Sequence, residues 1–396
     1  RHASLRTGFL EDEQGVSQQV LPKAQLSMQA FDLSPLERAE RESRLAALSQ
    51  AQGDSPFDLA QPPLLRAALV RLGSDEQVLL LALHHIVADG WSMNLLISEL
   101  IGAYERACGV ARAEPAVLPI QYRDFALWQR QWLEAGGRQA DLDYWLAHLG
   151  DTDGALRLPL RRARSAGEEL RAARLEIDLD PTLTARLKAL AGQEQVTLFM
   201  LLLAAYKLLL QRYGGQRSIR VAVPVANRNR AEVEGLIGCF INTQLLQTEL
   251  DPELDRRALL ARIKATALGA QAHQDLPFET LVRAMGNERH GEPFQALFNH
   301  QAQVLDVTRL QTATGLVLEA LPAQRRTCHC ELMLESHERG DQLQARFTYA
   351  AELFEPATIE QMAGHWRQLL EQLVAATPGP VGDWALATGE TPAVPS

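Results

Sequence analysis

The stretch LALHHIVADGWSMNLLISEL, residues 81–100, runs from apolar residues through a short polar loop into a helical pattern. The segment Val78 to His85 is nearly all apolar, as is typical of a strand buried on both faces. After the loop, apolar side chains recur at helical spacing from Leu95 to Tyr104. The stretch therefore predicts a strand, a tight loop and a helix, with two histidines and an aspartate at the turn.

His84 and His85 are the groups of this loop best suited to proton transfer, because the ordinary pKa of a histidine is about 6.5. Adjacent residues on a strand point to opposite faces, so these two side chains cannot both line one cavity. We expect one of them to act in chemistry and the other to be structural. A lone histidine is more often a hydrogen-bonded residue of the core than a catalytic one. The surrounding sequence pattern therefore has to distinguish the two roles.

Strand-like and helix-like segments alternate on both sides of this stretch. The pattern predicts an apolar helix from Thr197 to Tyr213, stopped by two glycines. Residues 150–167 mix Gly, Pro and Arg without periodicity, which favours a boundary there. We predict a first lobe over residues 1–160, a second over 161–385, and a linker toward a following domain over 386–396. Strands and helices in both halves indicate an α/β or α+β fold with a sheet in each lobe.

Composition narrows the class of protein. The 396 residues carry 49 acidic and 39 basic side chains, a net charge of −10, which argues against binding to nucleic acid. Four cysteines do not suggest a disulfide framework and fit a reducing compartment. No segment approaches the roughly 18–20 apolar residues of a membrane span, and the first residues lack the pattern of a signal peptide. We expect a cytoplasmic protein, with no membrane partner.

The sequence HHIVADG, residues 84–90, matches the HHxxxDG signature of the condensation domains of nonribosomal peptide synthetases, in the chloramphenicol-acetyltransferase-like superfamily. Further segments resemble the family's other motifs, in the family's order. They are RHASLRTGF (1–9), QYRDFALW (121–128), IGCFINTQ (237–244), HQDLPFE (273–279) and EPFQALFNHQ (292–301). The resemblance implies two chloramphenicol-acetyltransferase-like lobes in a V-shaped pseudo-dimer with a central tunnel. The family's earliest motif is not found, so we expect the first strand and helix of the N-terminal lobe to be missing.

The resemblance also assigns roles within the loop. It implies that His85 is the active-site histidine, with His84 as support. Asp89 resembles an aspartate that forms a buried salt bridge with an arginine of the RHxxLRT motif, for which Arg6 is the candidate. An Asx turn before Gly90 is the simpler account of Asp89 and does not exclude the ion pair.

Three further residues receive supporting roles. Gly90 lets the backbone approach a substrate carbonyl, and its amide is a candidate oxyanion donor. We expect Trp91 to pack beneath the loop. Asn242 resembles the family's asparagine near the tunnel, although a cap at a strand end explains it nearly as well.

The reaction that the resemblance implies is amide bond formation. The α-amine of an aminoacyl thioester on a downstream carrier protein attacks the thioester on an upstream carrier. The partners are therefore donor and acceptor peptidyl carrier protein domains and a following adenylation domain, in the cytoplasm of a bacterium. Substrates arrive on 4'-phosphopantetheine arms, and no bound cofactor or metal is expected. His85 acts either as a general base or as a positioning group, and the sequence leaves both open.

Several alternatives compete with condensation. Epimerisation domains share the double histidine but place Ser before Trp after the aspartate, whereas this chain has Asp89-Gly90-Trp91-Ser92. Heterocyclisation domains carry paired aspartates instead of this signature. Non-catalytic docking relatives normally have a broken signature. Cys328 and Cys330 are expected to be buried thiols on one strand face, not zinc ligands. The INTQ and FNHQ segments favour a D-configured donor only slightly.

Overall fold

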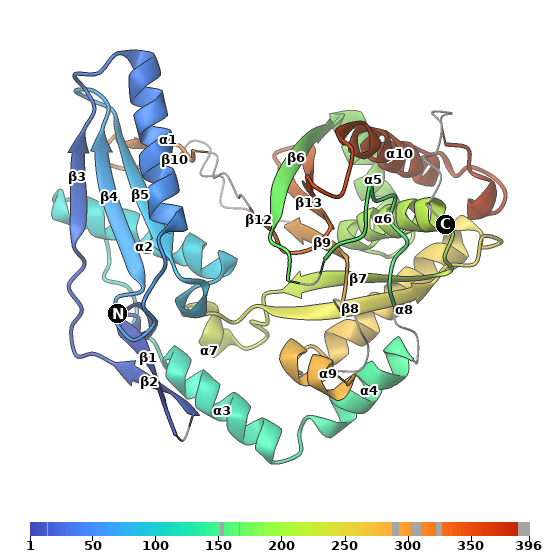
Figure 1. Ribbon diagram of the computed structural model, residues 1–396, viewed down its shortest axis with the longest axis horizontal. Coiled ribbons are helices and arrows are strands. Elements are labelled where there is room, and N and C mark those ends of the chain that lie inside the picture. The colour runs from blue at the N-terminus through green and yellow to red at the C-terminus, as the bar shows by residue number, and fades with distance from the viewer. Residues whose placement is uncertain are drawn as a thin grey trace. The chain divides into compact units, whose positions relative to one another are not determined.

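The computed structural model describes most of the chain, and Figure 1 shows the arrangement of its elements. The described residues are 1–13, 15–150, 154–165, 167–286, 293–301, 310–321 and 327–386. They form two compact units. Unit 1 consists of Arg1–Gly136, Ala226–Ile241 and Gln311–Leu316, and unit 2 of Gly137–Val225, Asn242–Leu310 and Val317–Ser396.

This division differs from the predicted boundary near residue 160. Helix α4 (Gln139–Leu149) already belongs to unit 2, because Trp145 and Leu149 are buried in the core of that unit. The chain also returns to unit 1 at 226–241, a long-range step that no local pattern reveals. The predicted linker over 386–396 lies outside the described residues, apart from Leu386.

Unit 1 is built on a three-stranded sheet in the order β3-β4-β5. β3 (Met28–Asp32) runs parallel to β4 (Leu65–Arg71), which runs antiparallel to β5 (Gln77–Leu83). Helix α1 (Arg38–Asp54) shares a small apolar cluster with this sheet. The other elements are η1 (Ala3–Arg6), the hairpin β1 (Thr7–Asp12) and β2 (Gly15–Val20), η2 (His85–Val87), α2 (Gly90–Ala107), α3 (Tyr122–Glu134) and α7 (Ala231–Glu234). The predicted order of strand, loop and helix is confirmed.

Unit 2 contains a seven-stranded sheet in the order β12-β6-β14-β13-β9-β7-β8. Its strands are β6 (Leu170–Leu179), β7 (Ser218–Val225), β8 (Asn242–Glu249), β9 (Ala296–Gln301), β12 (Thr327–Cys328), β13 (Leu332–Arg339) and β14 (Gln342–Ala350). Its remaining helices are α5 (Pro181–Gln193), α6 (Leu198–Gly214), α8 (Arg256–Ala272), α9 (Phe278–Ala284), α10 (Pro356–Ala375) and η3 (Val381–Asp383). Helices α5, α6, α8 and α10 pack on the sheet. A short ribbon, β10 (Leu310–Gln311) and β11 (Val317–Leu318), forms a separate sheet.

Helix α6 lies in the core of unit 2, as its apolar sequence predicts. Thr197 caps its N-terminus by accepting a hydrogen bond from the Met200 amide, and Gly215 ends it with a φ of 65°. The α6 residue Lys207 is fully buried, and its Nζ donates to the Leu246 carbonyl and Thr248 Oγ1, each at 2.7 Å. No single helix of the described residues has the length and apolarity to cross a bilayer. Helices α5 and α6 pass that test only as a pair, bent by 106°.

Candidate functional site

The two histidines of the HHIVADG segment occupy the first turn after β5, not the strand itself. Strand β5 ends at Leu83, and the 3-10 helix η2 begins at His85. His84 is the N-cap of η2, because its Nδ1 accepts a hydrogen bond from the Ile86 amide at 3.1 Å. Its ring also meets the Phe57 ring edge-on. The two histidines therefore do not lie on opposite faces of a strand, but the His84 side chain is hydrogen-bonded to the backbone.

His85 stands out from its neighbours because its side chain is exposed. It is the first residue of η2, so a short helical turn, not a flexible loop, carries the ring. Its Nδ1 lies 3.5 Å from Sγ of Cys239. The two ring nitrogens of His85 therefore differ, because Nδ1 has a sulfur neighbour.

Asp89 is the N-cap of helix α2 and organises the backbone around it. Its Oδ1 accepts hydrogen bonds from the Ser92 amide at 2.8 Å and from Ser92 Oγ at 2.7 Å. Its Oδ2 accepts from the Phe240 amide at 3.0 Å. The Asp89 side chain is only 2% exposed, so this carboxylate has exchanged its water for protein donors. Its role is architectural: it accepts from the amide three residues on, so it is the N-cap of α2 and not the Asx turn that the sequence suggested.

The buried partner of Asp89 is Arg228, and the predicted pairing with Arg6 is wrong. Nη2 of Arg228 lies 3.1 Å from Oδ1 of Asp89, and the Arg228 side chain is 1% exposed. Arg6 instead donates to the carbonyl of Leu21. The physical reason is the return of residues 226–241 into unit 1, which brings a cation to Asp89 from far along the chain. No motif singled out Arg228 in the sequence.

The guanidinium of Arg228 is held on several sides. Nη1 donates to the carbonyls of Val233 at 2.6 Å and Leu236 at 2.7 Å. The charge lies 4.1 Å from the centroid of the Phe240 ring, within the range of a cation–π contact. Burial lowers the pKa of Arg228, while the neighbouring Asp89 charge opposes that shift. The ion pair thus joins the returning segment to the start of α2.

The RHASLRT motif fastens the same returning segment from another side. His2 Nδ1 accepts a hydrogen bond from the Ile237 amide at 3.2 Å, and Ser4 Oγ donates to the Ile237 carbonyl at 2.6 Å. The other ring nitrogen of His2 lies 2.9 Å from Glu99 on α2. Burial lowers the pKa of His2. The motif therefore holds Ile237 by hydrogen bonds to both its amide and its carbonyl. Arg6 lines a groove next to the motif, together with Arg1, Leu96 and Leu100.

Gly238 sits where no side chain fits. A Cβ at this position would lie 2.2 Å from Cδ2 of Tyr122, which comes from the QYRDFALW segment. The Tyr122 hydroxyl donates to the carbonyl of Cys239 at 2.8 Å. Tyr122, Phe125 and Phe240 then pack as a small aromatic cluster. Four of the quoted motifs, at residues 1–9, 84–90, 121–128 and 237–244, therefore contribute residues to one part of unit 1.

Gly90 and Trp91 form the first helical residues of α2. Gly90 is exposed, and a Cβ built there meets no atom within 4 Å, so the backbone borders open space. Trp91 is 45% exposed and its Nε1 donates to the carbonyl of Glu234 at 2.9 Å. The prediction that Trp91 packs beneath the loop is wrong, because the buried space there is taken by the Asp89–Arg228 pair.

Asn242 lies at the start of β8 in unit 2, and its amide is engaged in four hydrogen bonds. Nδ2 donates to the carbonyls of Gln274 at 3.0 Å and Leu276 at 2.7 Å. Oδ1 accepts from the amides of Thr243 at 2.9 Å and Phe278 at 3.0 Å. These contacts hold the HQDLPFE segment, which is the role of a strand-end cap.

Two cysteines of unit 2 were predicted to be buried thiols. Cys328 and Cys330 are buried, as predicted, and burial raises the pKa of Cys328 to about 11. Among the described residues, no group of three or more potential ligands is placed to hold a metal.

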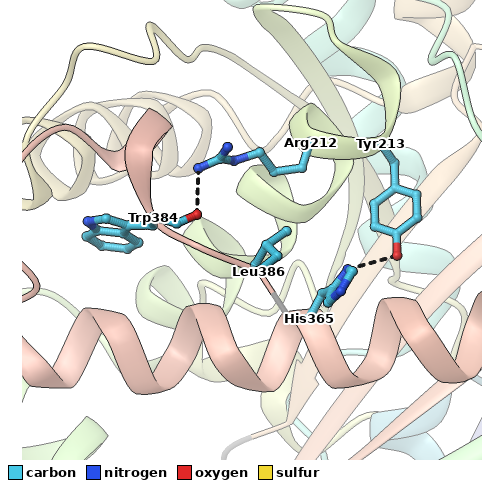
Figure 2. A pocket seen from close by; sticks show the side chains of 5 residues that line it. All are labelled: Arg212, Tyr213, His365, Trp384 and Leu386. Carbon is cyan, nitrogen blue, oxygen red and sulfur yellow. Dashed lines mark hydrogen bonds between the residues drawn. The ribbon is translucent and has the colours of Figure 1, made fainter. Parts of the chain in front are cut away.

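Figure 2 shows a cavity of about 200 Å³ in unit 2, where the Tyr213 hydroxyl meets His365 Nδ1 at 2.9 Å. Its remaining lining residues are Arg212, Trp384 and Leu386. The quoted motifs contribute none of these side chains. The candidate site is therefore the exposed His85 with the network that supports it.

Comparison with known proteins gives consistent matches. The family model of the condensation domain matches residues 1–392. A linear gramicidin synthase of Brevibacillus parabrevis is 42% identical over 375 residues, 93% of this chain but only 5% of that protein's length. Chondramide synthase of Chondromyces crocatus is 37% identical over 398 residues, 98% of this chain and 10% of that protein. The chain therefore spans only a small part of these relatives.

Solved structures match as well. A chain in the complex of the X-domain and OxyB from teicoplanin biosynthesis has a TM-score of 0.85 and 25% identity, covering 98% of this chain and 86% of its own. The first condensation domain of the calcium-dependent antibiotic synthetase, in complex with a substrate analogue, has a TM-score of 0.77 and 21% identity, covering 97% and 88%. The predicted mixed α/β, chloramphenicol-acetyltransferase-like fold class is confirmed.

Proposed function

We propose that this chain, which belongs to the condensation-domain family of nonribosomal peptide synthetases, catalyses amide bond formation between two carrier-bound thioesters. The α-amine of the downstream aminoacyl group attacks the upstream thioester carbonyl. The C–N bond forms, the C–S bond breaks, and the upstream pantetheine thiol leaves. The growing peptide is then attached to the downstream carrier.

The observation that carries the proposal is the contrast between His85 and the groups around it. His84 caps η2, and Asp89 and Arg228 neutralise each other in the interior. His85 is exposed and is held by a helical turn. An imidazole that is presented in this way is placed to accept a proton from another molecule, which is how a general base assists the attack of an amine on a carbonyl.

His85 contributes through Nε2. An α-amine has an unperturbed pKa of roughly 7.7–8.0, so an appreciable fraction is neutral in the cell without a strong base. Nε2 accepts the proton that the amine loses as the tetrahedral species forms, or holds the amine in line for attack. As a general base, His85 would contribute about 10²–10⁴-fold to the rate. The Gly90 amide, at the N-terminus of α2, is the candidate donor to the developing oxyanion.

The partners follow from this chemistry. Both substrates are thioesters on 4'-phosphopantetheine arms, so donor and acceptor carrier protein domains are the partners. An adenylation domain that follows in the same polypeptide would load the acceptor carrier. The solved four-domain nonribosomal peptide synthetase that matches this chain covers 98% of it with 30% of its own length, which fits a domain within a larger assembly. A bacterial cytoplasmic setting is part of the same proposal.

The test is to mix this chain with a donor-loaded and an acceptor-loaded carrier protein and to follow dipeptidyl carrier by intact mass. His85→Ala is the test variant, and Cys108→Ser, at an exposed position outside the network, is the matched control. We expect product from the wild type and the control, and a loss of about 10²–10⁴-fold in His85→Ala. Circular dichroism checks that all three are folded. Equal product from His85→Ala and the wild type would refute the role of His85.

Two other functions are outcomes of the same experiment. The complex from teicoplanin biosynthesis pairs an X-domain with OxyB, so a docking role is the second candidate. It predicts no product with any pair of substrates. An epimerisation domain would instead exchange the α-hydrogen of the donor residue, which mass spectrometry in D₂O detects. Absence of product together with deuterium uptake would replace condensation by epimerisation.

A further inference from the structure

Cys239 is the nearest reactive side chain to His85. It lies on the returning segment of unit 1, between the tightly packed Gly238 and the buried Phe240. Its Sγ is 3.5 Å from Nδ1 of His85, a distance at which sulfur takes part in a hydrogen bond. The thiol is partly exposed, and the imidazole is exposed.

The peptide unit that follows Cys239 is held at both of its polar atoms. The Tyr122 hydroxyl donates to its carbonyl at 2.8 Å, and the next amide, Phe240 N, donates to Asp89 at 3.0 Å. Because these hydrogen bonds hold the backbone, Cys239 loses little further conformational entropy when its side chain contacts His85. Cys239 can therefore restrain the imidazole. The same Asp89 also caps α2, so thiol and imidazole are anchored to one network.

We propose that Cys239 is a positioning residue for His85, whose Nδ1–H donates to Sγ so that Nε2 faces outward as the proton acceptor. In a neutral imidazole one nitrogen carries the proton and the other accepts, and the partner of one nitrogen selects the tautomer. A donor bond from Nδ1 therefore leaves the lone pair on Nε2. This inference deepens the proposed function and rests on it for its catalytic consequence, but the contact itself is tested separately.

The contact between His85 and Cys239 should also change the reactivity of the thiol. A donor that faces sulfur stabilises the thiolate over the thiol, and the thiolate is the nucleophile. His85 should therefore speed the alkylation of Cys239. The other cysteines serve as internal references, since Cys108 is exposed at the C-cap of α2, while Cys328 and Cys330 are buried. Because nucleophilicity falls as a thiol becomes more acidic, the acceleration expected near neutral pH is modest, about threefold.

The first experiment measures alkylation by iodoacetamide, residue by residue, by mass spectrometry of peptides. The thiolate sulfur displaces iodide, a C–S bond forms, and the thiol proton goes to the buffer. His85→Leu removes the donor but keeps bulk, whereas His85→Asn keeps an N–H close to the Nδ1 position. We expect the Cys239 rate to fall about threefold in His85→Leu and to stay near wild type in His85→Asn, with Cys108 unchanged. Equal Cys239 rates in all three proteins would overturn the proposal, whether or not the chain condenses amino acids.

The second experiment measures the condensation rate against pH for Cys239→Ala and Cys239→Ser. Serine restores an acceptor near Nδ1, and alanine does not. We expect Cys239→Ala to lower the limiting rate by about threefold to tenfold and to displace the pH profile, and Cys239→Ser to recover most of the loss. A profile for Cys239→Ala that superimposes on wild type would show that the thiol does not position His85.

Discussion

Replacement of Arg228 by methionine should destabilise unit 1 by about 4 kcal/mol. Removing one member of a buried ion pair costs roughly 3–5 kcal/mol, because the other charge stays buried without its partner. Here Asp89 keeps three protein donors, two from Ser92 and one from Phe240, which softens that loss. The carbonyls of Val233 and Leu236 lose their donor, which adds about 1 kcal/mol each. These opposing effects leave the estimate near the middle of the range.

Hydrogen exchange of the folded protein is the suitable assay, because a chain of two units need not unfold in one step. Peptides covering residues 88–95 and 236–241 report on the two ends of the ion pair. A loss of about 4 kcal/mol corresponds to about 10³-fold faster exchange of amides that open with this network. Peptides from β13 in unit 2 serve as the internal reference.

A matched control comes from the surface of the same unit. Arg38 pairs with Glu42 at 2.9 Å, with side chains 89% and 66% exposed, so Arg38→Met should cost no more than about 0.5 kcal/mol. Equal exchange rates of the 88–95 and 236–241 peptides in Arg228→Met and Arg38→Met would refute the predicted cost of leaving Asp89 without its partner. A double variant with Asp89→Asn should also lose less than the sum of the single changes, by at least about 1 kcal/mol.

Further predictions concern both units. Gly238→Ala forces a Cβ against Tyr122 and should lower the melting temperature and the condensation rate together, whereas Gly90→Ala, facing open space, should leave stability unchanged. Burial, with the Lys207 and Arg220 charges, lowers the pKa of His148 to about 4, so the unfolded chain binds a proton that the folded one rejects. His148 should therefore contribute a loss of stability between pH 6.5 and pH 4, by at most about 2.5 kcal/mol at pH 4.5, and His148→Gln should reduce the pH dependence in urea titrations. A further part should remain, because burial also lowers the pKa of His300 to about 4. Asn242→Ala removes four hydrogen bonds around the HQDLPFE segment and should cost unit 2 about 2–4 kcal/mol, measured by exchange of the 274–280 amides; Asn242→Asp should not recover this loss, because a carboxylate oxygen would then face the carbonyls of Gln274 and Leu276.

The local pattern around the histidines contains enough information to place them. An apolar run, a glycine-containing loop and helical spacing from Leu95 predict β5, η2 and α2 in the right order. The sequence suggests only an Asx turn for Asp89, whereas the structure shows that this residue caps α2. The apolar run predicts a strand that includes both histidines, whereas β5 ends one residue before them.

The partners of these residues are not readable in the same way. Arg228 is 139 residues from Asp89, and Cys239 is 154 residues from His85. Nothing in the amphipathic pattern of either neighbourhood indicates that residues 226–241 return to unit 1. Arg6 was the predicted partner of Asp89 because it belongs to the RHxxLRT motif. In the structure this motif instead forms hydrogen bonds to the backbone of Ile237.

The returning segment explains why one change can affect several functions of the loop. Asp89 is buried where it caps α2 and accepts a hydrogen bond from the Phe240 amide, and a buried carboxylate needs a nearby cation. Arg228 supplies that cation on the same segment that carries Cys239 to His85. Charge neutralisation in the interior and orientation of the exposed ring are therefore coupled through the backbone of this one short segment. It follows that Arg228→Met should slow condensation through the position of His85, although Arg228 does not touch that ring, and that Cys239→Ala should do so without loss of stability.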